Sequence, residues 1–153
     1  MAMLDVLDKD RTIARPGYSK WLIPPAALCV HLSIGQVYAF SVFKTSLVER
    51  FDSSQTAVAG IFSIAIVMLG LSAAFLGTWV ERAGPRKAMV SAAACWGSGF
   101  LIGSAGIAMG SLPLLYLGYG VVGGIGLGIG YISPVSTLIK WFPDRPGLAT
   151  GMA

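Results

Sequence analysis

The sequence predicts an all-α integral membrane protein with four transmembrane helices and the start of a fifth. Of its 153 residues, 55% are apolar and only 12% are charged, and the mean hydropathy is +0.73. A soluble domain carries about 25% charged residues. The 18 charged residues leave three charge-free segments, 21–43, 53–80 and 88–139. Because a membrane-spanning helix needs roughly 20 apolar residues, the first two segments each fit one helix and the third must hold two.

The first helix is expected at about 21–43, after a charged N-terminal arm over residues 1–20. Pro24 and Pro25 fall in its first turn, where a missing backbone N–H costs least. The second helix is expected at about 56–80, because the preceding Asp-Ser-Ser-Gln run supplies capping oxygens for its first turn.

The third and fourth helices are expected at about 88–109 and 112–141, separated by the Gly-Ser-Leu-Pro break. Pro134 is expected to bend the fourth helix. A fifth apolar segment begins at Gly147, and the chain ends a few residues later. We therefore expect the 153 residues to be the N-terminal part of a longer membrane protein.

The Lys and Arg residues predict the orientation of the chain. Nine of them lie in the arm and in the loops after the second and fourth helices, whereas two lie in the loop after the first. Basic residues favour the cytoplasmic side, so the N-terminus is expected in the cytoplasm of a multi-pass protein of the plasma (inner) membrane. The net charge of +4 is not read as a nucleic-acid signal, because the basic residues flank apolar spans.

No catalytic or metal-binding constellation is evident in the sequence. The chain has one histidine, and its charge-free segments contain neither Asp nor Glu. A zinc site or a nucleophile–base pair cannot be assembled from these residues. We therefore expect no enzymatic activity, no cofactor and no metal. Cys29 and Cys95 lie in different spans and are expected to be buried free thiols.

Closely spaced glycines in the fourth helix predict close helix packing. Residues 118–123 match the dinucleotide pattern GxGxxG, but that pattern needs a preceding strand and a soluble βαβ unit. Small residues four apart instead let neighbouring helices approach. Such packing is either static or part of a moving helix that lines a substrate path. The packing glycines are Gly120, Gly124, Gly126, Gly128 and Gly130.

Four polar or aromatic side chains within the spans are candidates for lining a substrate cavity: His31, Gln36, Tyr38 and Tyr131. Polar side chains inside a membrane are costly and tend to face a cavity or a partner. For His31 two interpretations stay open, an interhelical hydrogen bond and a proton relay, and no acidic partner lies in any span.

The loop between the second and third helices has the most specific pattern, Gly-Thr-Trp-Val-Glu-Arg-Ala-Gly-Pro-Arg-Lys. This spacing resembles the loop signature of the major facilitator superfamily, with Glu in place of the usual Asp, and Trp79 and Pro85 as further departures. The resemblance implies a charged network that holds one conformation, and the alternative is a plain basic loop. The residues that carry it are Gly77, Glu81, Arg82, Gly84, Arg86 and Lys87.

Segments 35–43, 123–131 and 140–151 are similar to the oxalate/formate antiporter group of that superfamily. The resemblance implies a fold of twelve helices in two halves that rock about a central site, of which this chain would hold part of the first half. It also implies a small organic anion as substrate, moved by exchange or by proton coupling. The implied partners are the lipid bilayer and the remaining C-terminal helices. A nucleic-acid partner is not expected, because the basic residues flank apolar spans.

Two other functions stay open from the sequence. One is a different carrier of the same superfamily, such as a proton-coupled monocarboxylate or sugar-acid transporter. The other is a small helical membrane protein without transport activity.

Overall fold

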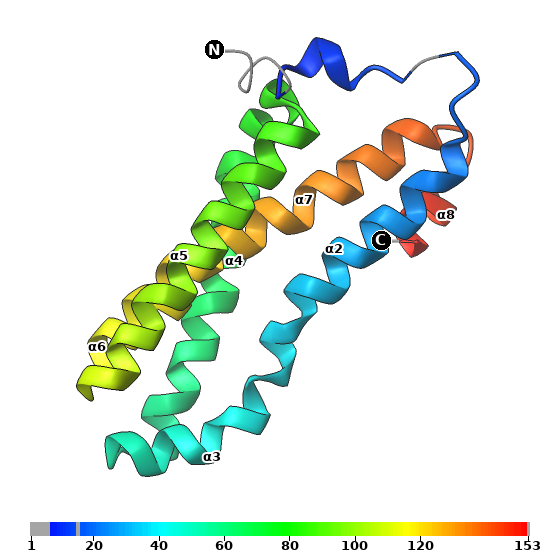
Figure 1. Ribbon diagram of the computed structural model, residues 1–153. Helices are drawn as coiled ribbons and strands as arrows, with labels where there is room; N and C mark the ends of the chain where they lie inside the picture. Colours follow the sequence, from blue (N-terminus) through cyan, green and yellow to red (C-terminus); the bar gives the residue numbers. More distant parts are fainter. Residues whose placement is uncertain (1–6, 15, 153) are drawn as a thin grey trace.

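The computed structural model describes residues 7–14 and 16–152, which form helices and connecting turns without a strand. Four of the resulting spans are long and apolar enough to cross a membrane, as the sequence predicts. Figure 1 shows them as a bundle of tilted helices, with the short 3₁₀ helix η1 (Lys9–Thr12) of the N-terminal arm lying across one end.

The first span is longer than expected and is not one regular helix. It runs through the 3₁₀ turn η2 (Lys20–Leu22), α2 (Ile23–Ile34), the 3₁₀ segment η3 (Gly35–Ala39) and α3 (Phe40–Phe51). The expected end at Phe43 is wrong, because the charged residues that follow it continue the helix. Asp52 then stops the helix with a left-handed backbone, φ +44°.

α4 (Gln55–Ala83) and α5 (Pro85–Met109) form the second and third spans. The Ser54 side chain accepts a hydrogen bond from the Ala57 backbone N–H, which caps the start of α4 as the sequence indicates. The expected loop over 81–87 is wrong in length, because only Gly84 separates the two helices.

The fourth span contains α6 (Leu112–Leu115), the π-helical segment η4 (Tyr116–Gly123) and α7 (Gly124–Trp141). Its limits agree with the expected helix, and Pro134 lies inside α7, which stays helical to Trp141. The π-helical segment is not predicted by the sequence. The short helix α8 (Pro146–Gly151) follows, close to the expected start of the fifth apolar segment.

The fourth span lies at the centre of the bundle and packs against α4, α5 and α2. Its side chains supply much of the core, which includes Leu115, Tyr119 and Leu127 with Val58 and Ile61 of α4. Large apolar side chains on the other helices point outward, among them Val42, Phe75 and Leu101, which are 73–77% exposed. Such exposure suits contact with lipid rather than water.

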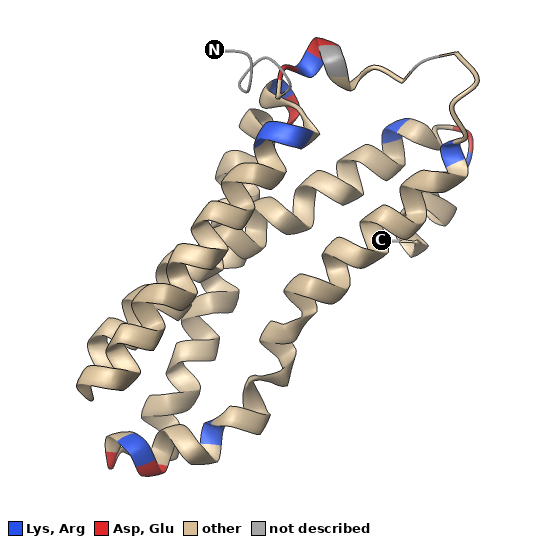
Figure 2. Cartoon of the chain, in the orientation of Figure 1, with Lys and Arg blue, Asp and Glu red and all other residues tan. Residues whose placement is uncertain are grey.

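Charged residues gather at the two ends of the bundle (Figure 2). The arm, the α4–α5 turn and the end of α7 lie at one end, and the end of α3 lies at the other. The two groups of Lys and Arg residues that the orientation argument compares thus lie at opposite ends of the bundle.

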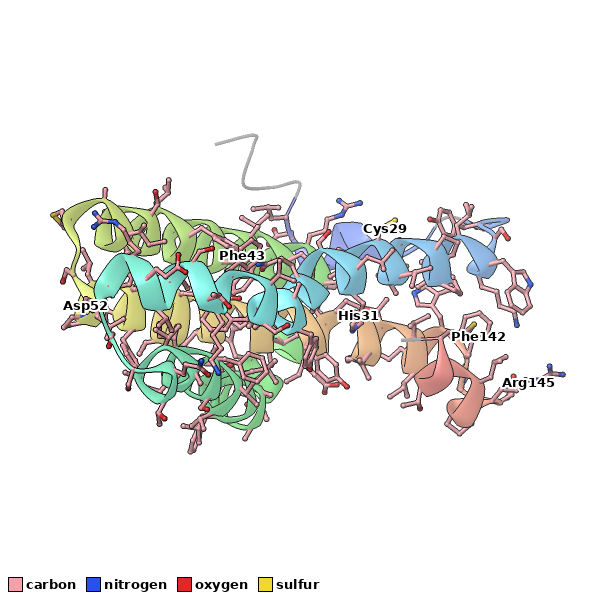
Figure 3. All side chains as sticks on the ribbon, turned by 90° about the horizontal axis from the view of Figure 1, so that it is seen from below. Cys29, His31, Phe43, Asp52, Phe142 and Arg145 are labelled. Carbon is pink, nitrogen blue, oxygen red and sulfur yellow. The ribbon has the colours of Figure 1, made fainter. Side chains whose placement is uncertain are left out.

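The two cysteines are both free, but only one of them is partly buried. Cys95 is partly buried, whereas Cys29 is exposed, so the expectation that both are buried is wrong for Cys29. Figure 3 shows Cys29 and His31 on opposite sides of α2. In a membrane protein, a residue on the outer face of a span contacts lipid. A free cysteine is tolerated there because it behaves as a small apolar side chain.

Candidate functional site at the α4–α5 turn and between α2 and α7

Gly84 makes the abrupt turn between α4 and α5. Its φ of +86° lies in the region that favours glycine. A side chain at this position would also meet Lys9 of the arm, whose Cβ and Cγ lie 3.2 Å from the place of a Cβ. Pro85 follows at the first position of α5, where its missing N–H is tolerated. The turn therefore places the charged ends of α4 and α5 side by side.

Glu81, at the end of α4, joins three parts of the chain. Its Oε1 lies 3.3 Å from Lys140 Nζ and accepts a hydrogen bond of 3.1 Å from the Ser136 hydroxyl, both on α7. Its backbone carbonyl accepts a hydrogen bond of 2.9 Å from Lys9 Nζ of the arm. The Glu81 side chain therefore links α4 to α7, and its backbone holds the arm.

The basic residues of the turn have different environments. Lys87 forms an ion pair of 2.6 Å with Asp8 of the arm. Arg82 is exposed, and Arg86 lines a cavity. Gly77 lies beside α7, because a Cβ there would be 3.8 Å from the Ile132 side chain. The residues of the sequence pattern thus surround one contact between α4, α5, α7 and the arm.

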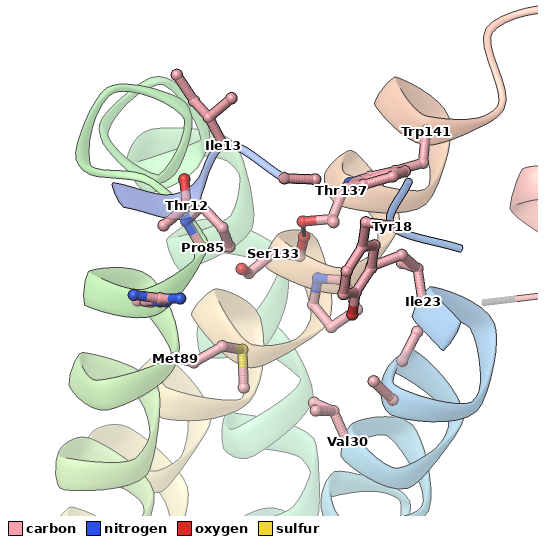
Figure 4. A pocket seen from close by; sticks show the side chains of 15 residues that line it. Thr12, Ile13, Tyr18, Ile23, Val30, Pro85, Met89, Ser133, Thr137 and Trp141 are labelled. Carbon is pink, nitrogen blue, oxygen red and sulfur yellow. Dashed lines mark hydrogen bonds between the residues drawn. The ribbon is translucent and has the colours of Figure 1, made fainter. Parts of the chain in front are cut away.

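The cavity beside Arg86 has a volume of about 960 Å³ and lies between the arm, α2, α5 and α7 (Figure 4). Most of its lining is apolar, as at Val30 and Met89. Its hydroxyl groups come from Thr12, Tyr18, Ser133 and Thr137.

The structure brings the four cavity candidates into three separate places. His31 and Tyr131 meet between α2 and α7, with ring centroids 5.5 Å apart. Gln36, on η3, lies beside the Tyr119 hydroxyl of η4 without hydrogen-bond geometry. Tyr38 is 69% exposed and packs its ring against Phe62 of α4.

Among the described residues, His31 has no partner for an interhelical hydrogen bond, which is one of its two interpretations. Its Nδ1 bonds instead to the Ala27 carbonyl oxygen, one turn earlier on the same helix, at 3.0 Å. Contact with α7 is made through the Tyr131 ring.

The packing glycines divide between two neighbours of α7. A Cβ on Gly124 would lie 2.7 Å from Met68 Cβ, and one on Gly128 would overlap Ser72, so this face touches α4. Gly120 approaches Ile64 of α4 in the same way.

Gly126 and Gly130 face the other neighbour, α5. A Cβ on Gly126 would lie 2.6 Å from the Trp96 backbone nitrogen, and one on Gly130 would lie 3.6 Å from Ala92 Cβ. At Gly124, Gly126 and Gly128 the separations are too short for a larger side chain, so close helix contact explains these three glycines. The contact at Gly130 is an ordinary van der Waals distance, and Ile34 of α2 lies equally near.

Three participants in these contacts were not singled out from the sequence: Ser136, Lys140 and Tyr119. Ser136 and Lys140 are four residues apart, so they share one face of a helix. That spacing, together with an opposite charge at the end of the second helix, is a signal that could have paired them with Glu81. No sequence signal places Tyr119 beside Gln36.

The sequence profile of the Major Facilitator Superfamily matches residues 26–153, which is most of the chain. The chain belongs to the major facilitator superfamily. Its four apolar spans and this membership make it a multi-pass membrane protein. The turn around Gly84 lies within the matched residues, and its pattern resembles the superfamily's loop signature with Glu81 as the acid.

Relatives within the superfamily are transporters. The chain is 29% identical over 135 residues to an uncharacterized MFS-type transporter, YhjX, of Escherichia coli, covering 88% of this chain and 33% of the relative. It is 30% identical over 129 residues to the oxalate:formate antiporter of Oxalobacter formigenes, covering 82% and 29%. It is 31% identical over 127 residues to monocarboxylate transporter 1 of Bos taurus, covering 80% and 25%. The chain thus spans a third or less of these superfamily members.

Proposed function

We propose that this chain forms the first part of a secondary active transporter that moves small organic anions, chiefly carboxylates, by alternating access. The observation that carries the proposal is the superfamily match across residues 26–153, with relatives named for oxalate, formate and monocarboxylates. In this mechanism two helical halves rock about a site between them. The chain would supply four helices of the first half.

The contact at the α4–α5 turn supports the conformational part of the proposal. Glu81 holds α7 through one carboxylate, and the pair with Lys140 leaves both side chains more than half exposed. Exposed ion pairs are weak because solvent screens their charges, so such a contact can form and break during a transport cycle. Glu81, Ser136 and Lys140 would act as a latch between α4 and α7.

The polar side chains of the first and fourth spans are proposed to line the substrate path. Tyr38 and Tyr131 are the exposed members, 69% and 47% respectively. Both can donate a hydrogen bond to a carboxylate and present an apolar ring to the rest of the molecule. The charge-free segments of this chain contain no Lys or Arg, so we assign the cation that pairs with the anion to helices outside residues 1–153.

The test is a counterflow assay on the full-length protein that contains this chain. The purified protein is reconstituted in liposomes loaded with oxalate, formate or lactate, and uptake of the labelled anion is measured. Saturable uptake that depends on an internal carboxylate supports the proposal, and preference for lactate with an inward proton gradient favours the monocarboxylate alternative. Folded protein without uptake of any of the three contradicts it and favours the non-transporting alternative.

A further inference from the structure

Lys9 of the N-terminal arm meets the turn between α4 and α5 at two places. Its Nζ donates a hydrogen bond of 2.9 Å to the Glu81 backbone carbonyl, in the last turn of α4. Its Cβ and Cγ lie 3.2 Å from the place that a Cβ on Gly84 would take. The neighbouring Asp8 pairs at 2.6 Å with Lys87, in the first turn of α5, and η1 packs against the same helix (Figure 1). These contacts hold this part of the arm on α4 and α5, and none of them involves α7.

The carboxylate of the same Glu81 is held by α7. Lys140 Nζ and the Ser136 hydroxyl both approach its Oε1, at 3.3 and 3.1 Å. Because these two residues are four apart on one helix, they approach and leave the carboxylate together. A carboxylate accepts up to about four hydrogen bonds on its two oxygens, so Glu81 has room for a further donor.

Lys9 and Lys140 share one small space with the carboxylate. Both lysines and Glu81 line a cavity of about 160 Å³ at the charged end of the bundle. All three side chains are exposed, and the Lys9 ammonium attracts the carboxylate across this space. An ammonium has three N–H donors, of which the Glu81 carbonyl takes one. Rotation of the Glu81 side chain therefore brings its carboxylate to Lys9 without any movement of α4 or the arm.

We propose that Lys9 is a second partner of the Glu81 carboxylate and binds it when α7 moves away from α4. Such a movement removes Lys140 and Ser136 in one step, whereas the arm stays with α4 and α5. The carboxylate then turns to Lys9 and keeps an opposite charge beside it. The free energies of the two arrangements differ less than if Glu81 lost every partner, which suits a contact that opens and closes repeatedly. The opening rests on the proposed function, but the exchange of partners is measurable without transport.

The first experiment is carbodiimide cross-linking of the 153-residue chain in lipid nanodiscs, followed by mass spectrometry. The reagent joins a carboxylate to a contacting ammonium as an amide, with the loss of one water overall. In the parent chain the main product at Glu81 should be the amide to Lys140. In Lys140→Gln the amide to Lys9 should become the main product. Lys44→Gln removes a lysine at the opposite end of the bundle and should leave the parent pattern unchanged. A yield of the Glu81–Lys9 amide that is equal in the parent and in Lys140→Gln would overturn the exchange.

The second experiment compares the thermal unfolding of Lys140→Gln, Lys9→Met and the double variant. Methionine keeps an apolar stem over Gly84 and removes the ammonium. Because each lysine replaces the other at Glu81, the double variant should lose more thermal stability than the two single variants lose in sum. Two losses that simply add would show that Lys9 does not take over from Lys140, and would overturn the proposal.

Both experiments are made without a substrate, so they separate this inference from the proposed function. Partner exchange in a full-length protein that shows no counterflow would support the inference and contradict the proposed function. Counterflow by a protein that shows no partner exchange would overturn the inference and leave the proposed function in place.

Discussion

Lys140 Nζ lies 3.3 Å from Glu81 Oε1 and joins the end of α7 to the end of α4. The Ser136 hydroxyl donates to the same carboxylate oxygen at 3.1 Å. The Glu81 carboxylate at the α4–α5 turn is thus bound by two side chains of α7. This contact therefore depends on the position of α7 relative to α4.

Glu81→Gln should weaken this contact while leaving the helices folded. The amide keeps a hydrogen bond to Ser136 but loses the charge that attracts Lys140, so the protein should unfold at a slightly lower temperature. Under the proposed transport function, Glu81→Gln and Arg86→Ala in the full-length protein should both slow counterflow. Glu49→Gln at the opposite end of the bundle is the control. Unchanged transport in both loop variants would show that the charges of the loop serve only to orient the chain in the membrane.

Exchanging the charges of Glu81 and Lys140 tests their ion pair more directly. Glu81→Lys places two ammonium groups together and should lower stability more than Glu81→Gln does. Adding Lys140→Glu restores an opposite pair across the same contact. Thermal unfolding of the single and double variants measures the recovery, and two losses that simply add would show that the two side chains do not interact.

Gly128→Ala should destabilise the bundle, although alanine is the better helix former. The added Cβ would overlap the Ser72 side chain and lie 2.5 Å from the Leu69 carbonyl oxygen. Overpacking of this kind costs about 1–3 kcal/mol. Gly70→Ala is the matched control, because nothing lies within 4 Å of its Cβ, and it should be neutral or stabilising by up to about 1 kcal/mol. Equal effects of the two substitutions on thermal unfolding would contradict the close contact of α7 with α4.

Lys87→Ala should release the N-terminal arm from the α4–α5 turn. The substitution removes the 2.6 Å pair with Asp8, whereas Arg82→Ala removes the same charge from the same turn without touching that pair. Trypsin should cleave after Lys9 faster in Lys87→Ala than in the parent or in Arg82→Ala. Because the pair is exposed, the increase should be no more than about fivefold. Equal cleavage in all three proteins would show that the pair does not hold the arm.

The orientation is tested with single cysteines in a chain that lacks Cys29 and Cys95. A cysteine at Ser53 should react with an impermeant thiol reagent added outside cells, and a cysteine at Ala83 should not. The reason is the excess of Lys and Arg at the end that carries the α4–α5 turn. The opposite pattern of labelling would reverse the predicted topology.

Charge-free length predicted the number and order of the spans, because an apolar helix in lipid satisfies its own backbone. It did not predict where the first helix ends. Lys44 marks the edge of an apolar segment, but a helix can continue past that edge while its charged side chains reach toward water. The actual end at Phe51 is decided by the left-handed backbone of Asp52.

The 3₁₀ and π-helical segments could not be predicted from the pattern of apolar residues. The 3₁₀ segment η3 and the π-helical segment η4 lie where Gln36 and Tyr119 meet. A change from α-helical to 3₁₀ or π hydrogen bonding depends on how the spans pack together. The spacing of apolar residues within one span does not predict it.

The loop signature was visible in the sequence, and its partners were not. Lys140 follows Glu81 by 59 residues, and Asp8 precedes Lys87 by 79. Pairing at such separations follows from how the spans pack. The glycines predicted helix contacts more directly. Because they are spaced four residues apart, they lie on faces of α7 that pack against α4 and α5.

The most direct test of the account is to place this chain in a working transporter. Residues 1–153 replace the matching segment of the oxalate:formate antiporter of Oxalobacter formigenes, and the chimera and the 153-residue chain are reconstituted separately in liposomes. We predict saturable oxalate exchange by the chimera and none by the chain alone, because a substrate site between two halves needs both. A folded chimera without exchange, beside an active parent antiporter, would contradict the assignment of this chain to the first half of an anion transporter.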